Sequence, residues 1–101
     1  MKSPDFEING EIVEFKYVSD LKGVTANKLS ARLSGRILEG GSQASKVTLD
    51  VTDQAGMTKE IAERAVSRAF GNQTFRGSDK IQEVRIFGKD FDITIPFISK
   101  K

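Results

Sequence analysis

The sequence predicts a mixed α/β (α+β) fold, with one mixed β-sheet, the element order ββαβαββ and two helices packed on the sheet. Three observations predict it. Both ends of the chain carry short runs in which apolar and polar residues alternate, as in half-buried strands. Between them lie two segments whose apolar residues recur every three to four positions, as on an amphipathic helix. Cap or turn residues bound these segments. At 101 residues the chain is expected to be one domain, over residues 1–101.

The first strand pair is expected over Asp5–Ile8 and Glu11–Val18, with Asn9-Gly10 as the connecting turn. Both central residues of a type I′ turn need positive φ, which Asn and Gly adopt readily, so this dipeptide between two patterned runs predicts a hairpin. The second run is apolar on both faces, which is typical of a strand inside a sheet.

The first helix is expected from Thr25 to about Glu39, with Thr25 as its N-cap and Gly40-Gly41 as its stop. The run Lys46–Val51 that follows is expected to be a strand. The apolar side of the helix is one line at i, i+4 and i+8, formed by Leu29, Leu33 and Ile37.

The second helix is expected from its cap Thr58 to about Phe70, with Gly71 ending it and residues 72–80 forming a loop. A closing hairpin is expected over Ile81–Phe87 and Asp90–Phe97, around a type II′ turn at Gly88-Lys89.

The predicted loop holds Phe75 next to Arg76. We interpret Phe75 as an aromatic side chain that anchors the loop in the core. Stacking of Phe75 on a nucleic-acid base is the alternative.

Composition excludes several kinds of chemistry. Apolar residues make up 38% of the chain and charged residues 30%, as in a globular protein. There is no cysteine and no histidine, which excludes disulfides, thiolate zinc sites and every catalytic step that needs imidazole. An enzyme would have to use carboxylates, Lys, Arg, Tyr, hydroxyls or a metal. The net charge of +2 permits nucleic-acid binding without predicting it. Neither a signal peptide nor an apolar run long enough to span a membrane is recognisable.

The first hairpin carries the candidate active site. A two-residue loop at Asn9-Gly10 sets Asp5 directly opposite Glu14, on the same face as Lys16. Two carboxylates that face each other repel unless a cation lies between them, and Lys16 supplies only part of that charge. We therefore expect Asp5 and Glu14 to bind Mg²⁺ or Mn²⁺. Asp5, Glu14 and Lys16 would then be catalytic, hydrolysing a phosphodiester with a metal-activated water. A plain salt bridge is the alternative.

Further residues are candidates for binding nucleic acid. Lys28, Arg32 and Arg36 recur at i, i+4 and i+8 of the first helix and form a basic stripe, which would contact phosphates or be a solvated helix face. Gln43 precedes the third strand, where it would position a water or bind main chain.

These motifs carry a family resemblance. Pro4-Asp5 followed by Glu14-Phe15-Lys16 on a hairpin resembles the PD-(D/E)xK signature of restriction-endonuclease-like nucleases. The stretch PDFEINGEIVEFK is similar to the core of the C-terminal tRNA-nuclease domains of bacterial contact-dependent growth inhibition toxins. The matching positions are Pro4, Asp5, Phe6, Ile8, Gly10, Glu14 and Lys16. Downstream, QASKVTLDV resembles the same group at Gln43, Ala44, Val47, Leu49 and Asp50.

The resemblance implies a metal-dependent endonuclease for RNA, tRNA in particular, with DNA as the alternative substrate. It also implies a toxin that acts in the cytoplasm, is delivered from another bacterial cell and has a cognate immunity protein. One departure stands out, because such nucleases usually have a helix before the PD strand and only three residues precede it here.

Two other functions stay open from the sequence. One is a metal-independent ribonuclease of the barnase or colicin type, in which Arg32, Arg36 and Lys16 would carry the phosphate and acid roles. The other is a non-catalytic interaction domain of a phage or mobile-element protein, which the missing leading helix favours.

Overall fold

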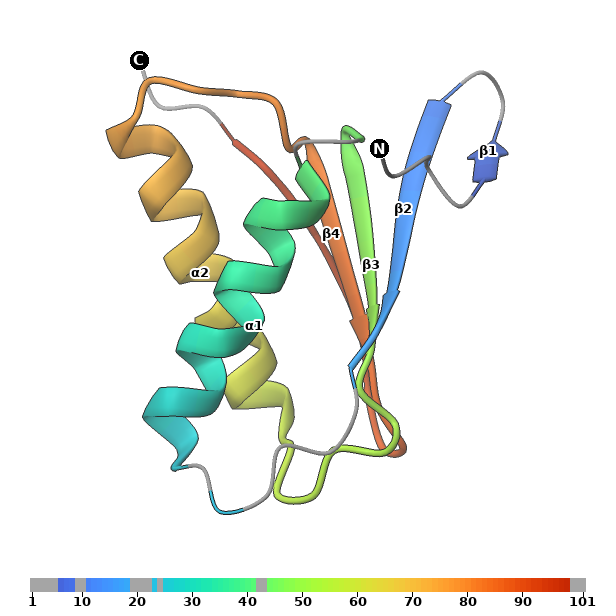
Figure 1. Cartoon of the computed structure of the whole chain (residues 1–101), viewed down its shortest axis with the longest axis vertical. Coiled ribbons are helices and arrows are strands. Elements are labelled where there is room, and N and C mark those ends of the chain that lie inside the picture. The colour runs from blue at the N-terminus through green and yellow to red at the C-terminus, as the bar shows by residue number, and fades with distance from the viewer. Residues whose placement is uncertain (1–5, 9–10, 19–22, 24, 42–43, 99–101) are drawn as a thin grey trace.

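The predicted element order is confirmed by the computed structural model, which describes residues 6–8, 11–18, 23, 25–41 and 44–98 (Figure 1). The elements run ββαβαββ along the chain, and the fold class is the expected mixture of one sheet and two helices. They are β1 Phe6–Ile8, β2 Glu11–Tyr17, α1 Ala26–Gly41, β3 Lys46–Asp50, α2 Lys59–Phe75, β4 Glu83–Phe87 and β5 Asp92–Pro96.

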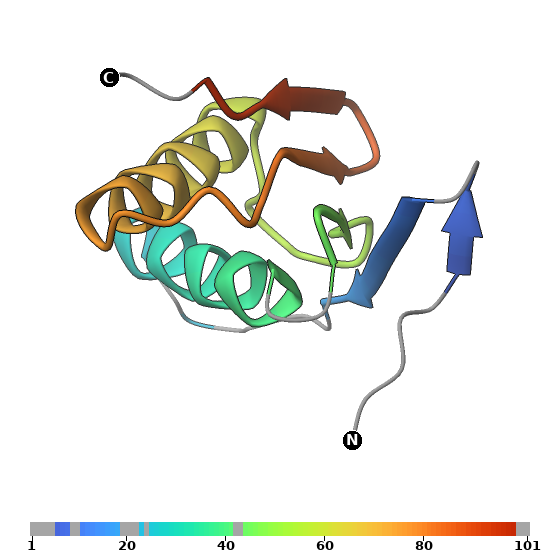
Figure 2. The ribbon, with the colours of Figure 1, turned by 90° about the horizontal axis from the view of Figure 1, so that it is seen from above.

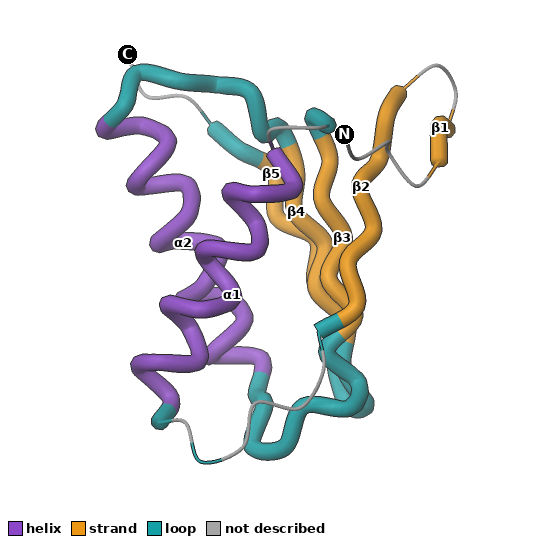
Figure 3. The backbone as a smooth tube through the Cα atoms, viewed as in Figure 1, coloured by secondary structure: helices purple, strands orange, loops and turns teal. Residues whose placement is uncertain are grey.

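The five strands form a single mixed sheet in the order β1-β2-β3-β4-β5 (Figure 3). The two outer pairs, β1–β2 and β4–β5, are antiparallel, while β2–β3 and β3–β4 are parallel. Parallel neighbours need a crossover connection, and α1 and α2 are the two crossovers. Both helices therefore lie on the same face of the sheet, side by side (Figure 2).

Both helices begin at the predicted caps. The Thr25 hydroxyl accepts a hydrogen bond from the Lys28 backbone N–H at 3.2 Å, and the Thr58 hydroxyl accepts one from Ile61 N–H at 3.2 Å. Each satisfies one of the N–H groups that a helix start leaves unpaired. Within the described ranges, no helix is long and apolar enough to cross a membrane.

The core fills the space between the helices and the sheet. The predicted apolar line of α1 is buried, and the alternate residues of β3 and β4 that face the helices are buried with it. This burial holds α1 and α2 on the sheet, because the removal of apolar surface from water is the main stabilising term. The central members are Leu29, Leu33, Ile37, Val47, Leu49, Val51, Ala62, Ala65, Val66, Val84 and Ile86.

Helix α2 is longer than predicted. It continues through Gly71 and ends after Phe75, so the expectation of a loop over residues 72–80 is wrong for its first four residues. The stop is Gly77, whose φ of 70° lies in the left-handed region that favours glycine. Gly77 N–H donates to Thr74 O at 3.0 Å and Ser78 N–H donates to Gln73 O at 3.0 Å, which is the Schellman pattern of a helix C-terminus.

The position of Gly71 inside α2 leads to a stability prediction. A Cβ there would meet no other atom within 4 Å, so Gly71→Ala adds helix propensity without a clash. We expect the free energy of unfolding to rise by about 0.5–1 kcal/mol. Gly77→Ala, the matched control, should be destabilising because of its positive φ. Urea denaturation of both variants checks this, and a Gly71→Ala variant less stable than wild type would contradict it.

The closing hairpin has a different turn from the predicted one. Phe87 pairs with Asp92, so the loop has four residues, and Gly88 N–H donates to Phe91 O at 2.9 Å. Gly88 is not among the glycines with positive φ, which a type II′ turn would require. The Phe91 ring explains the change, because it packs against the core and covers Gly88 so closely that a Cβ there would lie 2.7 Å from Phe91 Cε1.

The second face of the sheet carries no described helix (Figure 2). Its side chains pair with one another: the Phe15 and Phe87 rings lie 6.1 Å apart, and the Arg85 guanidinium lies 5.1 Å from the Phe87 ring centre. Arg85 also donates two hydrogen bonds to Asp92, at 2.9 and 2.7 Å, which lower the pKa of that carboxyl and raise the pKa of Arg85. This face is thus an aromatic and ion-paired surface.

Candidate functional site

The hairpin that carries the candidate site has the predicted register. Phe6 pairs with Val13, Glu7 with Ile12 and Ile8 with Glu11. The next pair in the prediction, Asp5 with Glu14, includes a residue outside the described ranges. The position of Asp5 opposite Glu14 therefore stays a prediction.

Glu14 and Lys16 point to the helix-covered side of the sheet. In the parallel register Glu14 lies beside Val47 and Lys16 beside Leu49, and both neighbours are core residues. Glu14 is only 4% exposed. The Lys16 ammonium lies 3.8 Å from Glu14 Oε1, and the Lys16 side chain is 11% exposed. Two of the three predicted catalytic residues are thus adjacent and largely withdrawn from water.

The Glu14 carboxylate is incompletely satisfied by its described neighbours. Its Oε2 atom is buried and accepts no hydrogen bond from them, while Oε1 has only the Lys16 ion pair. A buried polar atom without a partner costs roughly 1–3 kcal/mol, and more when it is charged. Such an atom calls for a partner, which an ordered water, a cation or a reacting group can supply. This oxygen is the feature that distinguishes the site from an ordinary surface salt bridge.

The last turn of α1 forms one wall of the site. Gly40 and Gly41 belong to this turn, so the prediction that they follow the helix is wrong by two residues. A Cβ at Gly40 would lie 2.9 Å from Val47 Cγ1 and 3.4 Å from Glu14 Cγ. The absence of a side chain at Gly40 allows the helix end to approach β2 and β3 this closely, and the absence of one at Gly41 allows it to approach Ile81.

The basic stripe lies on the flank of α1 away from α2. Lys28, Arg32 and Arg36 are exposed, as predicted. The groove between the helices is lined by other positions of α1, among them Ala31 and Ser34. Because α1 packs over β2 and β3, the stripe is on the side of β1 and β2, where the Glu14 side chain also lies.

The stripe is partly neutralised within α1 itself. Arg36 forms an ion pair with Glu39 at 3.6 Å, one turn further along the helix. Both side chains are more than half exposed, so this pair contributes little to stability and would exchange readily for a phosphate.

Two other residues of the predicted set do not join the described site. Gln43 lies outside the described residues, so its role stays a prediction. Asp50, one of the residues that carry the resemblance, pairs with Tyr17 on the opposite face of the sheet from Glu14. There it accepts hydrogen bonds from the Thr52 backbone and hydroxyl, at 3.0 and 2.7 Å, which is a local turn role.

The donor atoms suit a magnesium ion that is only partly held by protein. No group of three or more acidic residues, able by itself to hold a metal, occurs in the described part of the chain. Mg²⁺ keeps most of its waters and needs only one or two carboxylates together with substrate phosphates. Glu14, with its unsatisfied oxygen, is one such carboxylate, and Asp5, which lies outside the described residues, is the predicted second.

The interpretation of Phe75, at the end of α2, as a core anchor is wrong. Phe75 is 92% exposed rather than anchored in the core. Arg76, next to it, lines a pocket with Lys80. The only signal in the sequence was an aromatic residue beside an arginine, close to a glycine.

A comparison with protein-family models identifies the family of the chain. Residues 2–93 match the contact-dependent growth inhibition CdiA C-terminal domain. The match covers most of the chain, which therefore belongs to this family. The resemblance predicted from the sequence is confirmed at this level, while the nuclease type and the substrate are not tested by it.

A solved structure has a similar fold. It is the CdiA-CT/CdiI toxin and immunity complex from Burkholderia pseudomallei, with a TM-score of 0.50 and 14% sequence identity. The alignment covers 94% of this chain and 63% of that chain, so this chain spans less than two thirds of its structural relative. No curated protein sequence matches significantly.

Proposed function

We propose that this domain is a metal-dependent endonuclease that hydrolyses phosphodiester bonds of RNA, with tRNA as the expected substrate, and that it acts as a growth-inhibition toxin. The observation that carries the proposal is the buried Glu14 carboxylate, which has one unsatisfied oxygen and lies beside Lys16. Membership of the CdiA C-terminal domain family supports the role as a toxin.

Each residue has a role that follows from its chemistry. Glu14, together with Asp5, would hold Mg²⁺ or Mn²⁺ through hard carboxylate oxygens. When bound, the metal would polarise the phosphodiester and lower the pKa of a water molecule. Lys16 would orient that water and balance the charge that develops on phosphate oxygens. The partial exclusion of water around Glu14 and Lys16 strengthens these electrostatic effects.

The basic stripe would position the substrate. Lys28, Arg32 and Arg36 lie on the flank of α1 toward β1 and β2, so a nucleic-acid backbone along them would pass the end of the helix that covers Glu14. Contacts of this kind set affinity and register without reading sequence. Gln43 is proposed to assist near the site.

A protein partner is part of the proposal. A toxin that cleaves RNA would kill its own producer, so we propose a cognate immunity protein that binds this domain. The structural relative is itself a toxin and immunity complex, which supports this idea. The site of action would be the cytoplasm of a recipient bacterium.

The proposal is tested by cleavage of total tRNA, other RNA and DNA in Mg²⁺, in Mn²⁺ and in EDTA. We expect cleavage with either metal and none in EDTA. A parallel titration of the metal, followed by NMR amide shifts, should give saturable changes at Glu14 and Lys16. Full activity in EDTA would instead favour the metal-independent ribonuclease, and no cleavage with no metal shifts would favour the interaction domain.

A further inference from the structure

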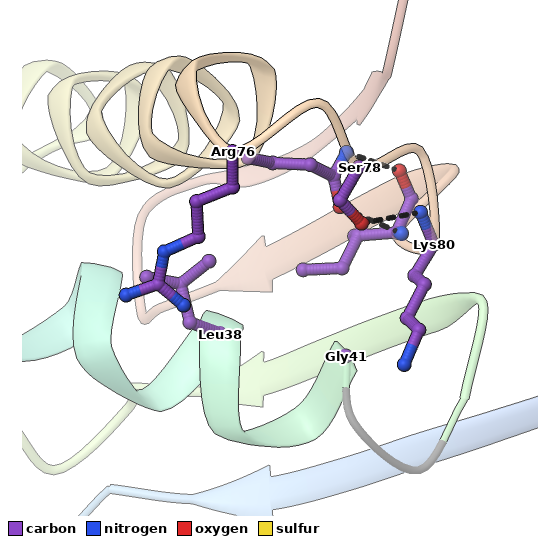
Figure 4. A pocket seen from close by; sticks show the side chains of 7 residues that line it. Leu38, Gly41, Arg76, Ser78 and Lys80 are labelled. Atoms are coloured by element: carbon purple, nitrogen blue, oxygen red, sulfur yellow. Dashed lines mark hydrogen bonds between the residues drawn. The ribbon is translucent and has the colours of Figure 1, made fainter.

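A pocket lies between the C-terminal ends of the two helices (Figure 4). Glu14 lies on the other side of the last turn of α1, against Gly40. Helix α1 contributes Leu38 and Gly41 to it, and the segment after α2 contributes Arg76, Ser78 and Lys80. In Figure 4, Arg76 extends from the end of α2 toward Leu38, while the Lys80 side chain extends past Gly41. The two cationic groups thus flank one opening.

The loop that carries this pocket is firmly held. Gln73, which is 3% exposed, accepts a hydrogen bond from Ile81 N–H at 2.8 Å and donates one to Ile81 O at 3.0 Å. The Ser78 hydroxyl accepts a bond from Lys80 N–H at 3.3 Å. Residues 78–81 therefore present Ser78 and Lys80 from a fixed backbone, which lowers the entropy cost of binding.

The charge of the pocket suits an anion. Among the described residues, its lining includes two cations, Arg76 and Lys80, and no acid. Asp79 lies between Ser78 and Lys80 in the chain but does not line the pocket. Neither Arg76 nor Lys80 forms an ion pair with a described residue. A guanidinium, an ammonium and a hydroxyl together are the donors that a phosphate group accepts.

An exposed aromatic ring adjoins the pocket. Phe75 is 92% exposed and lines the neighbouring groove between α1 and α2, which shares Leu38 with the pocket. Arg68 lies in the same groove. A ring exposed beside phosphate-binding cations is the arrangement that binds single-stranded nucleic acid, because a base stacks on the ring while its phosphate is neutralised.

The pocket and the candidate active site share one wall. Gly40 packs against Glu14 and Val47, and the next residue, Gly41, packs against Ile81 and lines the pocket. Only the last turn of α1 separates them. A nucleic-acid strand that enters the active site would pass this turn and reach both the active site and the pocket.

We propose that Arg76, Ser78, Lys80 and Phe75 form a subsite for a nucleotide that flanks the cleaved bond. The phosphate binds between Arg76 and Lys80, and an unpaired base stacks on Phe75. The subsite rests on the proposed nuclease function and extends it, because it selects substrates with a single-stranded or opened segment beside the cleavage point.

The test is the binding of a short labelled single-stranded RNA, measured by fluorescence anisotropy in EDTA at several salt concentrations. Each lost phosphate contact lowers the salt slope by about 0.7, so Arg76→Gln with Lys80→Gln, which together remove the contacts to the one phosphate of the subsite, should lower it by about 0.7. Phe75→Ala should weaken binding ~5- to 150-fold without changing the slope. The same variants should raise KM for RNA cleavage in Mg²⁺ while kcat stays close to the wild-type value.

The control is the pair Lys59→Gln and Lys89→Gln, which removes the same charge from exposed positions at the start of α2 and in the turn between β4 and β5. It should keep a slope near that of wild type. If the Arg76/Lys80 pair behaves like this control while the wild type still cleaves, the subsite is refuted and the nuclease stands. A wild type that neither binds nor cleaves nucleic acid refutes both.

Two further outcomes would also overturn the subsite. A lower melting temperature with unchanged RNA affinity would mean that the cations stabilise the helix ends. Unchanged RNA affinity with lost binding of an immunity protein would mean that the surface docks a protein.

Discussion

Glu14→Gln is expected to lower RNA cleavage at least ~10²–10³-fold, the loss typical of one charge-stabilising group in an active site. The amide keeps the shape of the side chain but removes the charge, and with it one of the two proposed metal-binding carboxylates. The buried Oε2 atom, which has no partner among the described residues, would no longer be part of a carboxylate that can bind a cation. Cleavage rates with excess Mg²⁺ measure the effect.

Lys16→Met separates metal binding, the proposed role of Glu14, from the proposed role of Lys16 in orienting water and balancing charge. It should reduce cleavage as strongly as Glu14→Gln, yet retain the saturable NMR shifts on metal titration, which Glu14→Gln should lose. Glu63→Gln and Lys59→Met, at exposed positions of α2, are the matched controls and should cleave at the wild-type rate. Wild-type activity in either site variant, with native circular dichroism, would remove Glu14 and Lys16 from the mechanism.

Gly41→Ala is expected to destabilise the fold by about 1–3 kcal/mol, the usual cost of overpacking a core. The new Cβ would overlap Cγ1 and Cδ1 of Ile81, a side chain that is 2% exposed and has little room to move. Gly35→Ala, on the exposed side of the same helix, meets nothing within 4 Å and should add about 0.5–1 kcal/mol of stability. Urea denaturation of the two variants gives opposite signs if the packing is as described.

A double-mutant cycle with Ile81→Ala tests whether overlap with Ile81 causes the destabilisation by Gly41→Ala. Ile81→Ala alone should cost about 2–5 kcal/mol because it leaves a cavity. Together with Gly41→Ala it should cost less than the sum of the two changes, since the new methyl group occupies part of that space. Additive costs would show that the two positions do not touch.

Much of the fold was predictable because local signals agreed with one another. Thr25 and Thr58 are caps that act within one helical turn. The three described pairs of the first hairpin have the register that Asn9-Gly10 predicts from the sequence. The shared face of Glu14 and Lys16 follows from the period of a strand alone.

The remaining features depend on contacts between distant residues. Gly71 and Gly77 are equally good helix stops in sequence, and the bonds between Gln73 and Ile81 favour the later one. The exposure of Phe75 follows from that extension, because the residue moves from a loop to the end of a helix. The depth of Glu14 depends on how closely Gly40 brings α1 to the sheet.

The paired bonds of Gln73 have a consequence for how the domain opens. The amide of Gln73 takes the place of a neighbouring strand for Ile81, so the end of α2 and the approach to β4 are held by one side chain. Neither segment can fray without leaving polar groups of the other unpaired. Terminal turns of helices are commonly the first parts of a protein to open, but here local unfolding should involve the last turn of α2 and residues 78–81 as one cooperative unit.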